Sequence, residues 1–290
     1  MITRHDRLRR SAAPRAIGLC ALSLLAASGA SAGDGASRWD GDARSAVRLV
    51  AGSSARGGAA PLRAGIEIRL KPGWHTYWRY PGDAGVPPRF DFAGSQNVET
   101  VDVLWPAPER IPEQGLVTIG YAGNVLLPLA VVPRDRGKPV TLRLKLDYAV
   151  CEKLCVPAEG KAELMLAGGG PASEDPALTA AEARVPKKVA LGEGSPLAVK
   201  SVRRDDGARR PRFIVDVAAP AGAEVALFAE GPAPDWALPV PSAVAGAPAG
   251  LQRFAFDLDG APPGAKYEGA PITLTARAGN AAIEVVIRLD

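Results

Sequence analysis

The chain alternates between apolar and polar residues with a period of two over much of its length. In the segment 141–148 the even-numbered residues are three leucines and Tyr148, and the odd-numbered residues are polar. The same period runs through 62–70, 213–217, 254–258 and 283–289. Strands with one polar and one apolar face, separated by turns, are typical of antiparallel β-sandwiches. The 32 glycines and 27 prolines can supply such turns, so the sequence predicts an all-β protein.

Helical periodicity is confined to 175–184. Asp175 can cap a helix there, Pro176 suits its first turn, and Pro186 ends it. The helix lies within a charged, glycine-containing stretch, 168–195, which we expect to link two domains. The predicted domains are two immunoglobulin-like β-sandwiches over 38–167 and 196–290, each long enough for the ~100 residues of that fold.

The first 32 residues differ in composition from the rest. Five arginines precede an apolar run of twelve residues, 16–27, which is followed by Ala30, Ser31 and Ala32. A basic segment, a short apolar run and small residues are typical of a Sec-type signal peptide, and we expect cleavage after Ala32. Twelve helical residues rise only about 18 Å, less than the ~30 Å hydrocarbon core of a bilayer. We therefore expect an exported protein that does not span the membrane.

Removal of this leader changes both the charge and the cysteine count. The full chain has 35 basic and 31 acidic residues, a formal charge of +4, and three cysteines. The leader holds five of the basic residues, one of the acidic residues and Cys20, so the mature chain is formally neutral. A neutral chain lacks the basic excess that favours nucleic acid, and we expect no nucleic-acid partner. Its two cysteines, Cys151 and Cys155, would lie in an oxidising compartment, where disulfides persist.

Cys151 and Cys155 are separated by only three residues. In an extended strand their Cα atoms would lie about 13 Å apart, whereas a disulfide needs less than ~7 Å. If they bond, the strand must end near Val150 and the chain must coil through 152–154. Pro157 would then help to end the turn before a strand over 161–166. A loop this short removes little entropy from the unfolded chain, about 2 kcal/mol, so stability is a weak reason for the bond.

Three functions remain open for the pair on spacing alone. It can be a redox site, since local disulfides are often exposed and readily exchanged, or an inert structural disulfide. Two thiolates can also bind Cu(I), with His75 or Met165 as a third ligand. A zinc site is disfavoured, because the mature chain has one histidine and no second cysteine pair. By itself His75 is expected to be a surface or half-buried strand residue, and Met165 a core residue.

Aromatic residues cluster upstream, at Trp74, Tyr77, Trp78 and Tyr80. Alternating aromatic residues in a strand usually pack in a core or pair across strands. The alternative is that Trp74, Tyr77 or Trp78 forms a wall around the cysteine pair.

Four segments occur in an order that resembles a known family. They are 72–90 (PGWHTYWRYPGDAGVPPRF), 103–110 (VLWPAPER), 119–129 (IGYAGNVLLPL) and 147–159 (DYAVCEKLCVPAE). They resemble the N-terminal periplasmic domain of the thiol:disulfide interchange protein DsbD, and more closely its ScsB-like branch. The resemblance covers about residues 45–167, and the second predicted domain looks like the extra β domain of ScsB-like proteins. The membrane-embedded and thioredoxin-like domains of DsbD have no counterpart in the resemblance.

The resemblance implies an immunoglobulin-like domain whose redox pair is matched by Cys151 and Cys155. It implies that Tyr148 and Pro157 frame this pair and that Cys155 is the cysteine that joins a partner, although nothing in the local sequence decides the second point.

The resemblance also places the stretch 112–117 where the family has a cap loop over the cysteines. That stretch holds no Phe or Tyr, so capping would fall to Leu116 or to a different arrangement.

The expected activity is thiol:disulfide interchange without a cofactor. The resemblance implies thioredoxin-like periplasmic acceptors, such as disulfide isomerases and cytochrome c maturation thioredoxins. It also implies that a separate membrane thiol reductant supplies the electrons.

Overall fold

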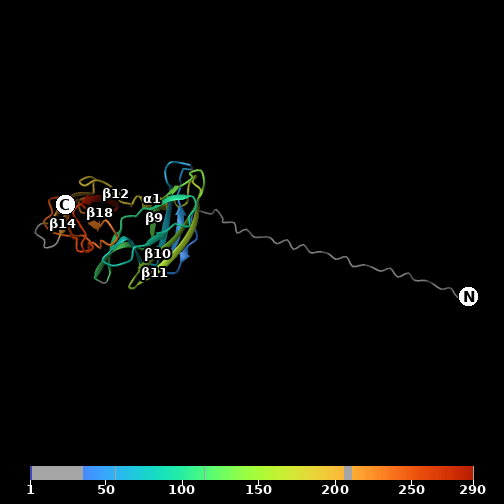
Figure 1. Ribbon diagram of the computed structural model, residues 1–290, viewed down its shortest axis with the longest axis horizontal. Helices are drawn as coiled ribbons and strands as arrows, with labels where there is room; N and C mark the ends of the chain where they lie inside the picture. Colours follow the sequence, from blue (N-terminus) through green and yellow to red (C-terminus); the bar gives the residue numbers. More distant parts are fainter. Residues whose placement is uncertain (2–34, 56, 114, 206–210, 290) are drawn as a thin grey trace. The chain divides into compact units, whose positions relative to one another are not determined.

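The computed structural model describes Met1 and residues 35–55, 57–113, 115–205 and 211–289 (Figure 1). The predicted leader and its cleavage after Ala32 lie outside the described residues, apart from Met1. In the described ranges the secondary structure is strands and a single short helix, which confirms the all-β class. No helix within these ranges has the length and apolar character needed to cross a membrane.

Residues 40–166 form two sheets around one hydrophobic core, and we call this unit the first sandwich. Its five-stranded sheet has the order β1 (Asp40–Gly41), β2 (Ser45–Ala51), β3 (Leu62–Leu70), β9 (Val125–Pro133) and β6 (Val98–Val103). Its six-stranded sheet has the order β11 (Cys155–Leu166), β10 (Val140–Cys151), β4 (His75–Gly82), β8 (Leu116–Ala122) and β7 (Glu109–Glu113), with β5 (Arg89–Asp91) paired to β10. All of these pairings are antiparallel.

Two four-stranded sheets from the C-terminal part enclose a second core, and we call this unit the second sandwich. One sheet has the order β12 (Lys187–Lys188), β19 (Ala281–Arg288), β18 (Pro271–Ala278) and β15 (Val225–Glu230). The other has the order β13 (Ala198–Arg204), β14 (Arg212–Ala218), β17 (Leu251–Asp257) and β16 (Ser242–Ala243). Because β12 pairs in parallel with β19, part of the predicted linker contributes a strand to this sandwich.

The period-two pattern predicts the faces of most strands correctly. In β10 the even-numbered residues from Leu142 to Tyr148 are buried in the core, and the polar residues between them lie on the other face. Met165 is an exception to our expectation, since 53% of it is exposed. It shares the phase of Lys161 and Glu163 in β11, whereas Leu164 packs against the core.

The predicted helix is α1 (Asp175–Glu182), which lies beside β9. Asp175 does not cap it, because the N-cap position is Glu174, which makes no side-chain capping bond. The Asp175 carboxylate instead accepts hydrogen bonds from the backbone N–H groups of Ser53 and Ala172. The fully buried Leu178 anchors the helix, and a Cβ at Gly65 of β3 would lie only 2.9 Å from its Cδ2 atom. Glycine at position 65 therefore permits the close approach of helix and sheet.

Charged side chains of β4 and β7 bind the second sandwich. The Arg79 guanidinium donates to Glu230 at 2.8 and 2.7 Å and to Glu284 at 2.7 Å. From β7, Arg110 donates to the backbone carbonyl of Leu227 at 2.9 Å. Phe228 of β15 packs into the core of the first sandwich, with its ring centroid 5.9 Å from that of Trp78. These contacts hold the same two strands that contribute to the site described next.

Candidate redox site

The two cysteines lie at the junction of β10 and β11. β10 ends at Cys151, β11 begins at Cys155, and residues 152–154 form the bend between them. The two cysteines are directly opposite in the antiparallel register, are joined by a disulfide, and have Cα atoms 4.1 Å apart. The chain therefore coils where the four-residue spacing requires it to coil.

We expected Pro157 to help end the turn before a strand that begins at residue 161, and this expectation is wrong. It lies inside β11 and opposes Ala149, because β11 begins at Cys155. β11 is an edge strand of its sheet, and an edge is where a residue without a backbone N–H is tolerated.

The two sulfur-bearing residues differ in access to solvent. Cys151 is fully buried and packs with Tyr77 and Ala149 in a small cluster apart from the main core. Cys155 is exposed. Cys155 is therefore the cysteine of the pair that a large partner molecule can contact, whereas Cys151 is closed off from solvent.

His75 opposes Cys151 in the register of β4 and β10, so its side chain lies beside the cysteine on the same face of the sheet. The residue is only 6% exposed, which corrects the expectation of a surface or half-buried histidine. Its ring packs edge-on against Tyr77, with centroids 5.5 Å apart.

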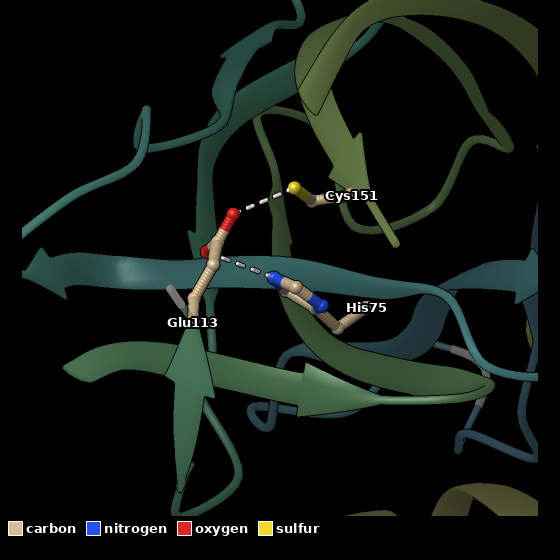
Figure 2. Close-up of side chains that lie close together, drawn as sticks. All are labelled: His75, Glu113 and Cys151. Carbon is tan, nitrogen blue, oxygen red and sulfur yellow. Dashed lines mark hydrogen bonds and ion pairs between the residues drawn. The ribbon is translucent and has the colours of Figure 1, made fainter. Parts of the chain in front are cut away.

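The carboxylate of Glu113, at the end of β7, lies between His75 and Cys151 (Figure 2). Its Oε1 atom is 2.8 Å from Cys151 Sγ and 3.1 Å from Cys155 Sγ, and its Oε2 atom is 3.4 Å from His75 Nε2. The sulfurs of a disulfide carry no proton, so these are contacts in the oxidised pair. After reduction each sulfur gains a hydrogen, and the same oxygen lies where it can accept it.

Tyr77 also contacts the pair. It lies two residues after His75 in β4, on the same face of the sheet. Its hydroxyl lies 3.0 Å from Cys155 Sγ. Burial, with a smaller contribution from the negative charge of Glu113, raises the pKa of the Tyr77 hydroxyl to about 12. Tyr77 therefore keeps its proton at neutral pH and can donate it in a hydrogen bond to a Cys155 thiolate.

Replacing Tyr77 with phenylalanine is expected to slow the alkylation of Cys155 by iodoacetamide about tenfold at neutral pH in the reduced protein. A hydrogen bond to a charged group contributes roughly 1.5 kcal/mol or more, and its loss disfavours the thiolate that reacts. Alkylation at each cysteine is followed by mass spectrometry. Tyr80→Phe is the matched control, because the Tyr80 hydroxyl donates to the backbone carbonyl of Leu238 instead. An equal effect of both variants would contradict a specific role for Tyr77.

The other aromatic residues of the upstream segment lie elsewhere. Trp78 is fully buried in the core of the first sandwich, and Trp74 packs against that core. Tyr148 is also a core residue, and its hydroxyl donates to Ser45 Oγ at 2.8 Å. Leu116 is 49% exposed and opposes Glu113 in the β7–β8 hairpin. Of the three aromatic residues proposed as a wall, the structure brings Tyr77 to the pair.

Sequence reasoning missed Glu113. It lies within the stretch 112–117 that the family resemblance matched to a cap loop, but we searched that stretch only for aromatic residues. The signal available was a single carboxylate in a segment expected to lie over two thiols.

The site therefore combines a cysteine that a partner can reach, a second cysteine held behind it, and groups that can move or hold a proton.

Comparisons with known proteins concern the family and the fold of the chain. Residues 47–167 match the family described as "Thiol:disulfide interchange protein DsbD, N-terminal". The fold is similar to the crystal structure of the N-terminal periplasmic domain of ScsB from Proteus mirabilis, with a TM-score of 0.67 and 20% sequence identity over 89% of this chain and 99% of that one. No curated protein matches the chain significantly. Residues 47–167 thus form a DsbD N-terminal-like domain, with the cysteine pair inside it.

Proposed function

We propose that the chain is a periplasmic thiol:disulfide exchange protein that passes reducing equivalents to partner proteins through Cys151 and Cys155. The observation that carries this proposal is the asymmetry of the pair, with one cysteine exposed, the other buried, and a carboxylate beside both sulfurs. An inert structural disulfide needs neither an exposed sulfur nor a proton acceptor.

The reaction begins with the reduced pair and a partner disulfide. Cys155 loses its proton to solvent, its thiolate attacks one partner sulfur, a new S–S bond joins the two proteins, and the partner disulfide breaks. The partner sulfur that leaves takes up a proton. In the second step Cys151 gives its proton to Glu113, and its thiolate attacks Cys155 Sγ. The mixed disulfide breaks, the second partner sulfur takes up a proton, and two electrons and two protons have passed to the partner.

Thioredoxin-like periplasmic proteins, including cytochrome c maturation thioredoxins and disulfide isomerases, are the acceptors we propose, with a separate membrane thiol reductant as the donor. The match to the DsbD N-terminal family supports both proposals.

The test is direct exchange between the reduced protein and an oxidised thioredoxin-like acceptor, followed by thiol labelling of both. We expect the acceptor to be reduced, and we expect the pair to equilibrate with a glutathione buffer. A reduction potential below about −300 mV would mark a structural disulfide and contradict the proposal.

Replacing Glu113 with glutamine is expected to slow this exchange about 100-fold at neutral pH. The amide cannot take the proton of Cys151, and a positioned acid or base typically contributes a factor of 10² or more. Stopped-flow measurement of acceptor reduction gives the rate. Glu152→Gln removes the same charge from an exposed position in the bend between the cysteines and serves as the control. If Glu152→Gln slowed the exchange as much as Glu113→Gln, the loss of a negative charge would explain the result, and the role of Glu113 as a proton acceptor would be contradicted.

A further inference from the structure

One nitrogen and one oxygen at the site have no hydrogen-bond partner among the described residues. They are His75 Nε2 and Glu113 Oε2, and both atoms are buried. They lie 3.4 Å apart, on side chains that are 7% and 12% exposed. The proposed exchange uses the Oε1 atom of Glu113, which contacts the sulfurs, and no step of it involves His75. A buried nitrogen and a buried carboxylate oxygen that lie 3.4 Å apart, next to two sulfurs, are the types of donor atom that a metal site uses.

The separations fit a single ion. Ligand atoms of His75, Glu113 and Cys151 all lie within 4.8 Å of one another (Figure 2). Cys155 Sγ lies 3.1 Å from the carboxylate of Glu113, so this sulfur can supply a fourth ligand. Tetrahedral zinc with bonds of about 2.0 to 2.3 Å places its ligand atoms roughly 3.3 to 3.8 Å apart. The nitrogen and carboxylate are already at such a separation, and reduction frees the sulfurs to move apart to theirs.

We propose that the reduced form of the protein binds one Zn²⁺ ion through Cys151, Cys155, His75 and Glu113. Two thiolates, one imidazole and one carboxylate make a complete tetrahedral set for zinc. The sequence disfavoured zinc because a fourth ligand could not be found, and Glu113 of β7 supplies it. Zinc suits this set better than Cu(I), because a carboxylate is a hard ligand and Cu(I) selects soft ones.

Binding is gated by the redox state of the pair. A thiolate is the ligand form of cysteine, so each thiol loses its proton to solvent as zinc binds, and no electrons are transferred. The disulfide form offers no thiolate, and it retains only the histidine and the carboxylate as ligands. Zinc therefore distinguishes the two redox states of the protein.

The consequence for function rests on the proposed exchange activity. Zinc would engage both sulfurs and Glu113, the groups that attack a partner and accept the proton. The zinc-bound protein is then reduced but inactive, and removal of the metal restores it. Zinc would act as a reversible inhibitor of the same site.

The test measures zinc affinity of the full chain without any exchange partner, by competition with a chromogenic chelator under anaerobic conditions. We expect one Zn²⁺ per reduced chain and at least 100-fold weaker binding after oxidation. Co²⁺ in place of zinc should give a thiolate-to-cobalt charge-transfer band and the intense visible bands of a tetrahedral ion.

His75→Phe keeps a ring against Tyr77 and removes the nitrogen ligand, and it is expected to weaken zinc binding at least tenfold. Glu113→Gln should weaken it as well, whereas Glu152→Gln should bind like the wild type. Thermal unfolding of His75→Phe verifies that the variant folds. Zinc binding that is equal in the two redox states, or unchanged in both His75→Phe and Glu113→Gln, would overturn the proposal.

The two proposals can fail separately. If the protein binds zinc in this way but reduces no acceptor, only the proposed exchange function is contradicted. If it exchanges disulfides but shows no redox-dependent zinc binding, only the proposed zinc site is contradicted.

Discussion

Replacing Cys151 with serine is expected to yield a protein that traps thioredoxin-like partners as stable mixed disulfides through Cys155. The rate of acceptor reduction should fall to the rate measured without the protein, because the cysteine that would break the mixed disulfide is gone. Replacing Cys155 should abolish both turnover and trapping, since the remaining sulfur of Cys151 is fully buried. Complexes formed with an oxidised acceptor are resolved on non-reducing gels, and the linked cysteine is identified by mass spectrometry.

The double variant, Cys151→Ser with Cys155→Ser, is the control for trapping by unrelated contacts. Both single variants lose the same short disulfide loop, so its unfolded-chain entropy of about 2 kcal/mol does not distinguish them. Equal trapping by the two single variants would contradict the division of roles between an exposed and a buried sulfur.

Replacing Arg79 with alanine is expected to destabilise the folded protein by about 3 kcal/mol or more. Its guanidinium lies between the carboxylates of Glu230 and Glu284, which are 14% and 12% exposed, and the variant would leave both without their shared cation. Removing one partner of a buried ion pair is costly because an uncompensated charge remains away from water. Urea unfolding measured by tryptophan fluorescence gives the free energy.

Two comparisons separate this explanation from simple loss of packing. Arg143→Ala removes an arginine whose partner, Glu163, is 58% exposed, and this variant should cost less than about 1 kcal/mol. Combining Arg79→Ala with Glu230→Gln and Glu284→Gln should recover part of the loss, because no charge is then stranded. If the three substitutions cost the sum of their separate effects, stranded charge is not the cause.

The sheet faces were predictable because they depend on local alternation. A strand with one buried face shows its period directly, as β3 and β10 do. The bend between the cysteines was predictable for a similar reason, since four residues of strand cannot bring two Cα atoms within bonding distance. Met165 was misassigned because its own apolar character was weighed above the phase of its strand, in which Lys161 and Glu163 already mark its face as the exposed one.

The environment of the pair was beyond local reasoning. His75 is buried because β7 and its Glu113 lie beside it, and these are 38 residues further along the chain. Glu113 reaches the sulfurs because the register of the six-stranded sheet carries its hairpin there. Neither residue belongs to a pattern that periodicity or spacing can show. Long-range register decides such positions, and a single sequence does not reveal it.

The pairing of His75 with Cys151 has a consequence for folding. The partners are 76 residues apart, so the site belongs to the non-local contacts that slow the folding of β proteins. A shift of one residue in the register of β4 against β10 would turn His75 and Tyr77 to the opposite face of the sheet. In a misfolded or unfolded chain the two cysteines are ordinary thiols without these neighbours. Reactivity of this pair is therefore a report of correct strand pairing, and the chemistry is acquired only when the topology is complete.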